Sequence, residues 1–192
     1  MKYEELQKLN FNGRQIIQIN NGIPEFNKEC IPNYFYLSEL DYLNRAGLAF
    51  ATISQKTMPK QKRPKISFKP TGWQEDETII DGSLQQIYNR SHLLAWDLIG
   101  IGNEPKNLIT GTRLLNGDLM QLFENRISSY VENYNNEVRY QVVPIFKDDN
   151  LLASGVWMMA QSSNCQGISF NVYLFNVQTN IEIDYKTGRI KK

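Results

Sequence analysis

The sequence has little of the chemistry that builds metal clusters or disulfide frameworks. Its 192 residues include one histidine, His92, and two cysteines, Cys30 and Cys165. Two thiols and one imidazole cannot form the four-ligand zinc site of a structural zinc domain. No spacing pattern indicates that the distant cysteines pair, so we expect them to be structural or free, with one long-range disulfide as the alternative.

Long apolar runs and a strong net charge are also absent. No stretch approaches the roughly 18 apolar residues of a membrane helix, so we predict no membrane span. The N-terminal residues 1–8 are polar and lack the apolar core of a signal peptide. Three explanations stay open. The protein is not exported through a signal peptide, or the chain begins after its signal peptide, or it is a domain from the C-terminal end of a longer exported effector. The formal net charge of +1 gives no global positive field to indicate a nucleic-acid partner.

Positive charge is nevertheless concentrated in one segment, residues 56–69, which we call the basic loop. Pro59 and Pro64 exclude a regular helix there. A solvated loop is the simpler interpretation, and a loop that grips phosphates, with Lys62 and Arg63 as the candidate contacts, is the alternative. The segment has no acidic residue and six basic ones: Lys56, Lys60, Lys62, Arg63, Lys65 and Lys69.

The hydrophobic pattern predicts an α+β fold. In the first half we expect weak helix over residues 3–9, a short strand over 15–19, a helix over 39–45 capped by Ser38, and a buried strand over 47–53. Residues 71–81 are polar and favour a surface connection. The composition, 41% hydrophobic and 21% charged, is typical of a folded domain of this length.

The second half divides into a helical part and a β part. Residues 88–92 and 107–110 favour short extended segments, with a turn of helix over 93–98 between them. Apolar residues at nearly helical spacing predict a helix over 114–134, although Gly117 weakens its start and regular helix is expected only from about Asp118. The last third predicts an antiparallel meander, with strands near 138–142, 152–160 and 168–174 and a short final strand at 181–183.

His92 is the candidate general base for hydrolysis. An ordinary histidine pKa of about 6.5 leaves it mostly neutral at pH 7 and able to take a proton from water. We therefore expect activity to fall as the pH drops through the His92 pKa. Arg90, two residues earlier in an expected strand, points to the same side and is either a phosphate contact or a structural strut.

The helix that follows carries a candidate metal site. The Asn116 amide oxygen is a neutral hard donor that suits Mg²⁺ retaining most of its waters. Glu124 is on roughly the same face, about 12 Å away if the helix is regular, so it would act through a metal-bound water. An ordinary solvent-facing Glu124 is the alternative. Arg113 is a candidate phosphate contact because its planar guanidinium matches the geometry of phosphate oxygens, and Asn89 adds a hydrogen-bonding group.

These residues resemble the DNA/RNA non-specific endonucleases, the ββα-metal nucleases with an Asp-Arg-Gly-His signature, and are most similar to the streptodornase-like branch. The resemblance rests on Asn89-Arg90-Ser91-His92, on residues 107–113 with Asn116, and on Phe123-Glu124-Asn125. It extends over segments 36–50, 69–73, 142–146, 152–156, 170–173 and 183–185. Asn89 and Ser91 depart from the signature's Asp and Gly, as in that branch.

The resemblance implies a ββα-metal nuclease core with a central antiparallel sheet flanked by helices, spanning residues 33–192 after an N-terminal segment, 1–32, of unclear role. It implies cleavage of DNA, and in many members RNA, with His92 as base, Asn116 as the Mg²⁺ ligand and Glu124 beside the metal's waters; Mn²⁺ is an expected substitute. It also implies a secreted enzyme, or a toxin domain neutralised by an immunity protein. A non-catalytic nucleic-acid-binding module on the same scaffold is the rival hypothesis.

Overall fold

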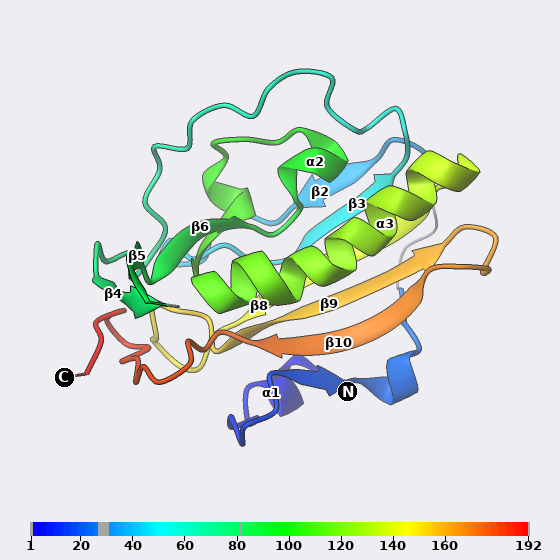
Figure 1. The fold of residues 1–192 in the computed structure, drawn as a ribbon. Helices are drawn as coiled ribbons and strands as arrows, with labels where there is room; N and C mark the ends of the chain where they lie inside the picture. The colour runs from blue at the N-terminus through cyan, green and yellow to red at the C-terminus, as the bar shows by residue number, and fades with distance from the viewer. Residues whose placement is uncertain (1, 27–30, 81, 192) are drawn as a thin grey trace.

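A six-stranded antiparallel sheet forms the centre of the fold (Figure 1). The computed structural model describes residues 2–26, 31–80 and 82–191. The predicted C-terminal meander is confirmed, because adjacent strands pair in sequence order from β8 to β10. Across the sheet the order is β1 (Ile16–Gln18), β10 (Ser169–Phe175), β9 (Gly155–Ser162), β8 (Val138–Ile145), β3 (Ala49–Ile53) and β2 (Phe35–Leu37).

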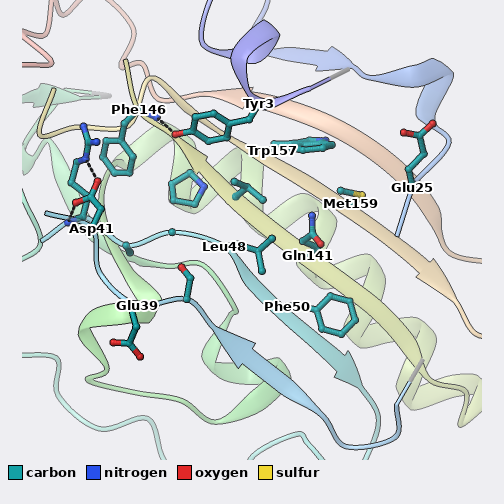
Figure 2. Close-up of a pocket in the computed structure, with 16 residues that line it drawn as sticks. Tyr3, Glu25, Glu39, Asp41, Leu48, Phe50, Gln141, Phe146, Trp157 and Met159 are labelled. Atoms are coloured by element: carbon teal, nitrogen blue, oxygen red, sulfur yellow. Dashed lines mark hydrogen bonds and ion pairs between the residues drawn. The ribbon is translucent and has the colours of Figure 1, made fainter. Parts of the chain in front are cut away.

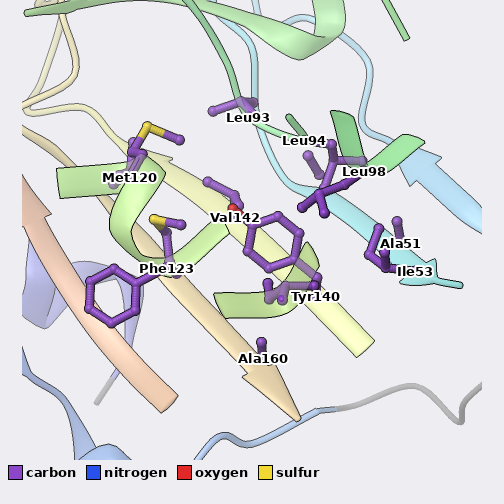
Figure 3. Packing of buried hydrophobic residues seen from close by; sticks show 14 of the residues in the cluster. Ala51, Ile53, Leu93, Leu94, Leu98, Met120, Phe123, Tyr140, Val142 and Ala160 are labelled. Carbon is purple, nitrogen blue, oxygen red and sulfur yellow. The ribbon is translucent and has the colours of Figure 1, made fainter. Parts of the chain in front are cut away.

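Helix α3 (Gln121–Tyr134) crosses one face of this sheet diagonally (Figure 1). The strands present alternate residues to it, so Tyr140 and Val142 of β8 are buried in the main core. Phe123 extends from the helix toward the sheet beside Met120 (Figure 3). A slip of one residue in β8 would turn this apolar set to the other face, so the burial fixes the register.

The other face of the sheet is covered in part by the N-terminal residues. Helix α1 (Tyr3–Leu6) and the turn η1 (Asn20–Gly22) flank β1, and Leu6 and Ile19 are buried in a second apolar cluster with Tyr173. The uncovered part of this face holds a largely apolar cavity of about 620 Å³, with Phe50 and Trp157 in its wall (Figure 2).

A two-stranded ribbon beside the sheet carries the Asn-Arg-Ser-His segment. Strand β6 (Tyr88–His92) pairs with β7 (Leu108–Thr112). Helix α2 (Trp96–Ile99) and the turn η2 (Pro105–Asn107) connect them. The buried Asn107 side chain accepts from the Leu94 amide at 2.9 Å and donates to the Leu94 carbonyl at 3.0 Å, which fixes the chain just after His92.

The long connection from β3 arcs over α2 and includes the basic loop (Figure 1). It ends in a hairpin of β4 (Glu77–Ile80) and β5 (Ser83–Gln86), where a polar connection was predicted. The expected final strand is reduced to two isolated bridges, Gln178 with Ile181 and Ile183 with Ile190. No helix within the described ranges is long and apolar enough to cross a membrane.

The predicted helix over residues 39–45 is wrong. The Asp41 carboxylate accepts the backbone N–H groups of Leu43 and Arg45, each at 2.9 Å, and Asn44 has a left-handed φ of 61°. This local bonding competes with the helical pattern and produces a turn. The Arg45 guanidinium then pairs with Asp41 at 2.7 Å.

The long helix over residues 114–134 is present, but its start differs from the prediction. Residues Leu114–Met120 (η3) form a π-helix, and regular α-helix begins at Gln121 instead of near Asp118. A π-helical segment is wider than an α-helix and often marks a functional position. The 12 Å estimate for Asn116 and Glu124 assumed a regular helix and therefore does not apply.

Candidate active site

His92 is held at the end of β6 by both of its ring nitrogens. The residue is only 5% exposed. Its Nε2 lies 2.8 Å from the Gly102 carbonyl oxygen. Because a carbonyl only accepts, Nε2 carries the proton and Nδ1 carries the lone pair. A guanidinium Nη atom of Arg63, from the basic loop, donates to Nδ1 at 2.9 Å.

This environment keeps the imidazole neutral. Burial, with a smaller contribution from the Arg63 charge, lowers the pKa of His92 to about 4, against the opposing effects of the Gly102 carbonyl and the Asp97 carboxylate. The pKa is far below the ordinary value used in the sequence-based expectation. At pH 7 the imidazole is therefore neutral, and its Nδ1 lone pair accepts the hydrogen bond from the Arg63 guanidinium.

His92, Arg63, Asn116 and Glu124 line one cavity of about 90 Å³. We call it the catalytic cavity. Its four main groups come from β6, the basic loop, the π-helix and the first turn of α3. The remaining wall consists of Ala95, Trp96, Asp97 and Gln121. A base, a cation and two oxygen donors thus share a space large enough for a few waters or one phosphate group.

Glu124 has a strongly perturbed carboxyl group. Burial raises its pKa to about 8, against a smaller lowering by the Tyr140 hydroxyl, which donates to it from β8 at 3.4 Å. The Asp97 charge also raises the pKa, and the Arg63 charge lowers it. A carboxyl whose charge is disfavoured in this way gains much from a nearby cation.

The donors of this cavity fit a divalent metal that keeps most of its waters. The described residues contain no group of three or more His, Cys, Asp or Glu side chains able to hold a metal. Mg²⁺ needs no such cage, since one or two protein oxygens, waters and a substrate phosphate complete its octahedron. Asn116 would supply a neutral amide oxygen, and Glu124 a carboxylate.

The other predicted site residues lie outside the catalytic cavity. The Arg90 guanidinium lies over the Trp73 ring, 4.3 Å from its centroid, and its buried Nε has no hydrogen-bond partner among the described residues. Asn89 and Arg113 come together in a second, larger cavity. Lys62 is exposed in the basic loop. Cys165 is exposed and forms no disulfide with another described residue, and Cys30 lies outside the described residues.

The sequence interpretation did not identify several residues that shape the site. Asp97 and Gln121 line the catalytic cavity, the Gly102 carbonyl selects the His92 tautomer, and Tyr140 hydrogen-bonds Glu124. Asp97 had a usable signal, since an acid five residues after a candidate base is close to it in any short turn. Gly102 and Tyr140 reach the site only through the way the chain folds, and no sequence pattern around them indicates these contacts.

A histidine on a β-ribbon, followed by a helix with an amide and a carboxylate facing the same cavity, defines a ββα-metal nuclease core. The model of the DNA/RNA non-specific endonuclease family matches residues 26–164 of this chain. The chain therefore belongs to the DNA/RNA non-specific endonuclease family.

Individual relatives agree with this assignment. A deoxyribonuclease from Streptococcus dysgalactiae subsp. equisimilis is 33% identical over 107 residues, which are 53% of this chain but only 32% of that protein. The crystal structure of NucA from Streptococcus agalactiae with a magnesium ion bound has a TM-score of 0.82 at 24% identity, covering 92% of this chain and 87% of that one. The structure of Sda1 nuclease with a bound zinc ion has a TM-score of 0.73 at 25% identity, covering 83% and 81%.

Proposed function

We propose that this protein is an Mg²⁺-dependent endonuclease that hydrolyses phosphodiester bonds of DNA without sequence preference, with RNA as a second substrate and Mn²⁺ as a substitute metal. One observation carries the proposal: His92, Arg63, Asn116 and Glu124 line the same small cavity. Family membership and the magnesium-bound NucA structure support the metal and the substrate.

His92 is the general base in this proposal. The Gly102 carbonyl holds the Nε2 proton, so Nδ1 is the atom that accepts a proton from the attacking water. In the free protein, Arg63 donates to Nδ1. Phosphate oxygens compete for the same guanidinium, so substrate binding frees the lone pair and places Arg63 on the phosphate.

Asn116 and Glu124 are the proposed metal-holding residues. A divalent ion held by these residues would supply positive charge to the phosphate and to the leaving oxygen. Asn116 would hold the ion through its amide oxygen, and Glu124, once ionised, would hold the ion's waters. Arg90, stacked on Trp73, supports the strand that carries His92.

A plasmid-nicking assay tests the proposal. We expect supercoiled DNA to be nicked with Mg²⁺, left intact with EDTA, and cleaved about 10²–10⁴-fold more slowly by His92→Ala, the range of a lost general base. Added imidazole should partly restore the His92→Ala variant. DNA and RNA that stay intact with wild-type protein and Mg²⁺ would contradict the proposal.

The rival, a nucleic-acid-binding module without catalysis, predicts salt-dependent binding of DNA without cleavage in the same assay. Secretion and an inhibitor protein partner are further proposals that rest on the family resemblance. Detection of the protein in culture medium would support secretion. Expression inside a host cell without harm would argue against a toxin that needs an immunity protein.

A further inference from the structure

A second cavity of about 580 Å³ lies beside the catalytic cavity, with the π-helix forming part of both walls. We call it the outer cavity. Asn116 faces the catalytic cavity, while its neighbour Gly117 lines the outer one. The polar residues of the outer cavity are Asn89, Arg113, Asp118, Gln178, Thr179 and Asn180.

The side chains of this wall are available for a ligand. The exposed Arg113 guanidinium has no ion pair or hydrogen bond with any described residue, and the same holds for the side-chain amides of Asn89 and Asn180. A cation and two amides that share a concave wall without bonding one another can bind a molecule that carries both an anion and hydrogen-bonding edges.

The wall is also held in place. The Gln178 side-chain oxygen accepts the Leu114 backbone N–H at 3.1 Å, which ties the C-terminal segment to the start of the π-helix. Residues 178–181 form a tight turn in which the Ile181 N–H donates to the Gln178 carbonyl at 3.2 Å. This turn carries Thr179 and Asn180, so the cavity does not depend on a loose loop.

The two cavities adjoin at the π-helix, where the neighbouring residues Asn116 and Gly117 line one cavity each. Asn89 precedes His92 by three residues on β6. Side chains three residues apart on a strand point to opposite faces, so the Asn89 and His92 side chains lie on opposite faces of β6.

We propose that the outer cavity binds one nucleotide of the substrate strand, beyond the phosphate that is cleaved. Arg113 holds the backbone phosphate, and the amides of Asn89 and Asn180 meet the base edge. The Asp118 carboxylate on the same wall repels phosphate and can accept a hydrogen bond from an amino group of a base. Amides offer both donors and acceptors, so such a site tolerates every base. This inference rests on the proposed function.

Two substrates of different length test the proposal. Bis(p-nitrophenyl) phosphate fits the catalytic cavity but is too short to reach the outer one, whereas a 12-nucleotide single strand spans both. We expect Arg113→Met to lower kcat/KM for the oligonucleotide about tenfold, mainly through KM, as for a lost hydrogen bond to a charged group. Its kcat/KM for the short substrate should stay unchanged. Arg14→Met, which removes an exposed arginine of the N-terminal segment, is the matched control.

Binding measured without catalysis separates this inference from the proposed function. Anisotropy of the labelled 12-nucleotide strand in EDTA should show weaker binding by Arg113→Met and Asn89→Ala than by Arg14→Met. If the wild-type protein cleaves nothing but Arg113→Met still binds the strand more weakly than Arg14→Met does, the nuclease proposal is rejected and the outer site is supported. Equal behaviour of Arg113→Met and Arg14→Met would overturn the inference, as would an equal loss on both substrates. If inorganic phosphate competes as well as a nucleoside 5′-monophosphate, the cavity recognises phosphate alone and the nucleotide assignment is wrong.

Discussion

The two cavities on either side of the π-helix differ in size and in the state of their polar groups. The catalytic cavity has about 90 Å³ and holds a buried imidazole and a carboxyl, both with strongly shifted pKa values. The outer cavity has about 580 Å³ and is lined by amides and an exposed guanidinium. The polar groups of the catalytic cavity are shielded from water, whereas those of the outer cavity stay hydrated.

This difference separates chemistry from binding. Desolvation strengthens every electrostatic interaction in a small cavity, so a change of one group there affects the reaction strongly. In an open, polar cavity a single contact competes with water and contributes less. Size alone does not locate the reaction, since the 620 Å³ apolar cavity on the opposite sheet face contains none of the proposed catalytic groups. Mutations should therefore have graded effects, largest in the catalytic cavity.

The largest expected effect, apart from loss of His92, is that of Asn116→Ala. Loss of a group that merely supports a metal ligand costs about 10–100-fold in metal affinity or activity, so loss of the direct ligand should cost at least about 100-fold at limiting Mg²⁺. The Mg²⁺ dependence of plasmid cleavage measures this. Asn125→Ala, on the same helix but outside the catalytic cavity, is the control and should match wild type. An unchanged Mg²⁺ requirement in Asn116→Ala would remove Asn116 from the metal site.

Arg63→Ala should have the next largest effect. The guanidinium is proposed to move from His92 to the phosphate, so its loss should lower kcat/KM about 10–100-fold, the value of hydrogen bonds to a charged group. Steady-state kinetics on the oligonucleotide measure it. Lys62→Ala removes the neighbouring charge without the contact to His92, and its loss should be smaller. A Lys62→Ala effect equal to that of Arg63→Ala would mean that only the charge of the basic loop matters.

The pH dependence should distinguish the buried base from an ordinary histidine. Burial lowers the His92 pKa to about 4, so the base stays neutral until the pH falls close to that value. At saturating Mg²⁺ we expect activity to change little between pH 5 and 8 on account of His92 and to fall as the pH drops through about 4. The sequence-based expectation, from an ordinary pKa, placed this fall near pH 6.5. A fall centred there would show that the imidazole is solvated during the reaction.

The same pH series, measured at limiting Mg²⁺, should show the contribution of Glu124 to metal binding. Its carboxyl, with a pKa of about 8 in the metal-free protein, must ionise to help hold a cation, so the apparent Mg²⁺ affinity should decrease as the pH falls below 8. Glu124→Gln should lose this pH dependence together with some affinity. A pH-independent Mg²⁺ requirement in the wild type would contradict a role of Glu124 near the metal.

Local patterns in the sequence were sufficient for much of the fold. The alternation in residues 138–174 predicted the meander because one face of each strand is buried, and the apolar spacing after Leu114 predicted the long helix. The helix over residues 39–45 was wrong because Asp41 bonds the backbone more favourably as a turn than helix propensity predicts. The π-helix was not predicted, since no sequence period identifies it.

The sequence predicted which residues form the candidate site, but not the contacts between them. Motif spacing identified His92, Asn116 and Glu124, which line one cavity. The contact of Arg63 with His92 joins positions 29 residues apart, and the hydroxyl on Glu124 comes from the next strand of the fold. Such contacts depend on how a proline-containing loop and a sheet pack, which local periodicity does not encode. The same limit separated Arg90 from Arg113, two arginines that were each predicted as candidate phosphate contacts.

The smallest effect on activity is expected on the other face of β6, at Ser91, where the family signature has Gly. Ser91 is fully buried but is not among the residues that line the catalytic cavity, and its Oγ occupies the space in which a Cβ on Gly111 would lie, 2.2 Å away. Ser91→Gly should keep plasmid cleavage within about twofold, because the groups around His92 are untouched, while urea unfolding should show a loss of about 0.5–1 kcal/mol from the added backbone freedom in a strand. Gly111→Ala, in contrast, should destabilise the ribbon through the clash with Ser91, and the double variant should recover part of that loss. A strong fall in activity of Ser91→Gly at unchanged stability would mean that this face of β6, too, takes part in the reaction.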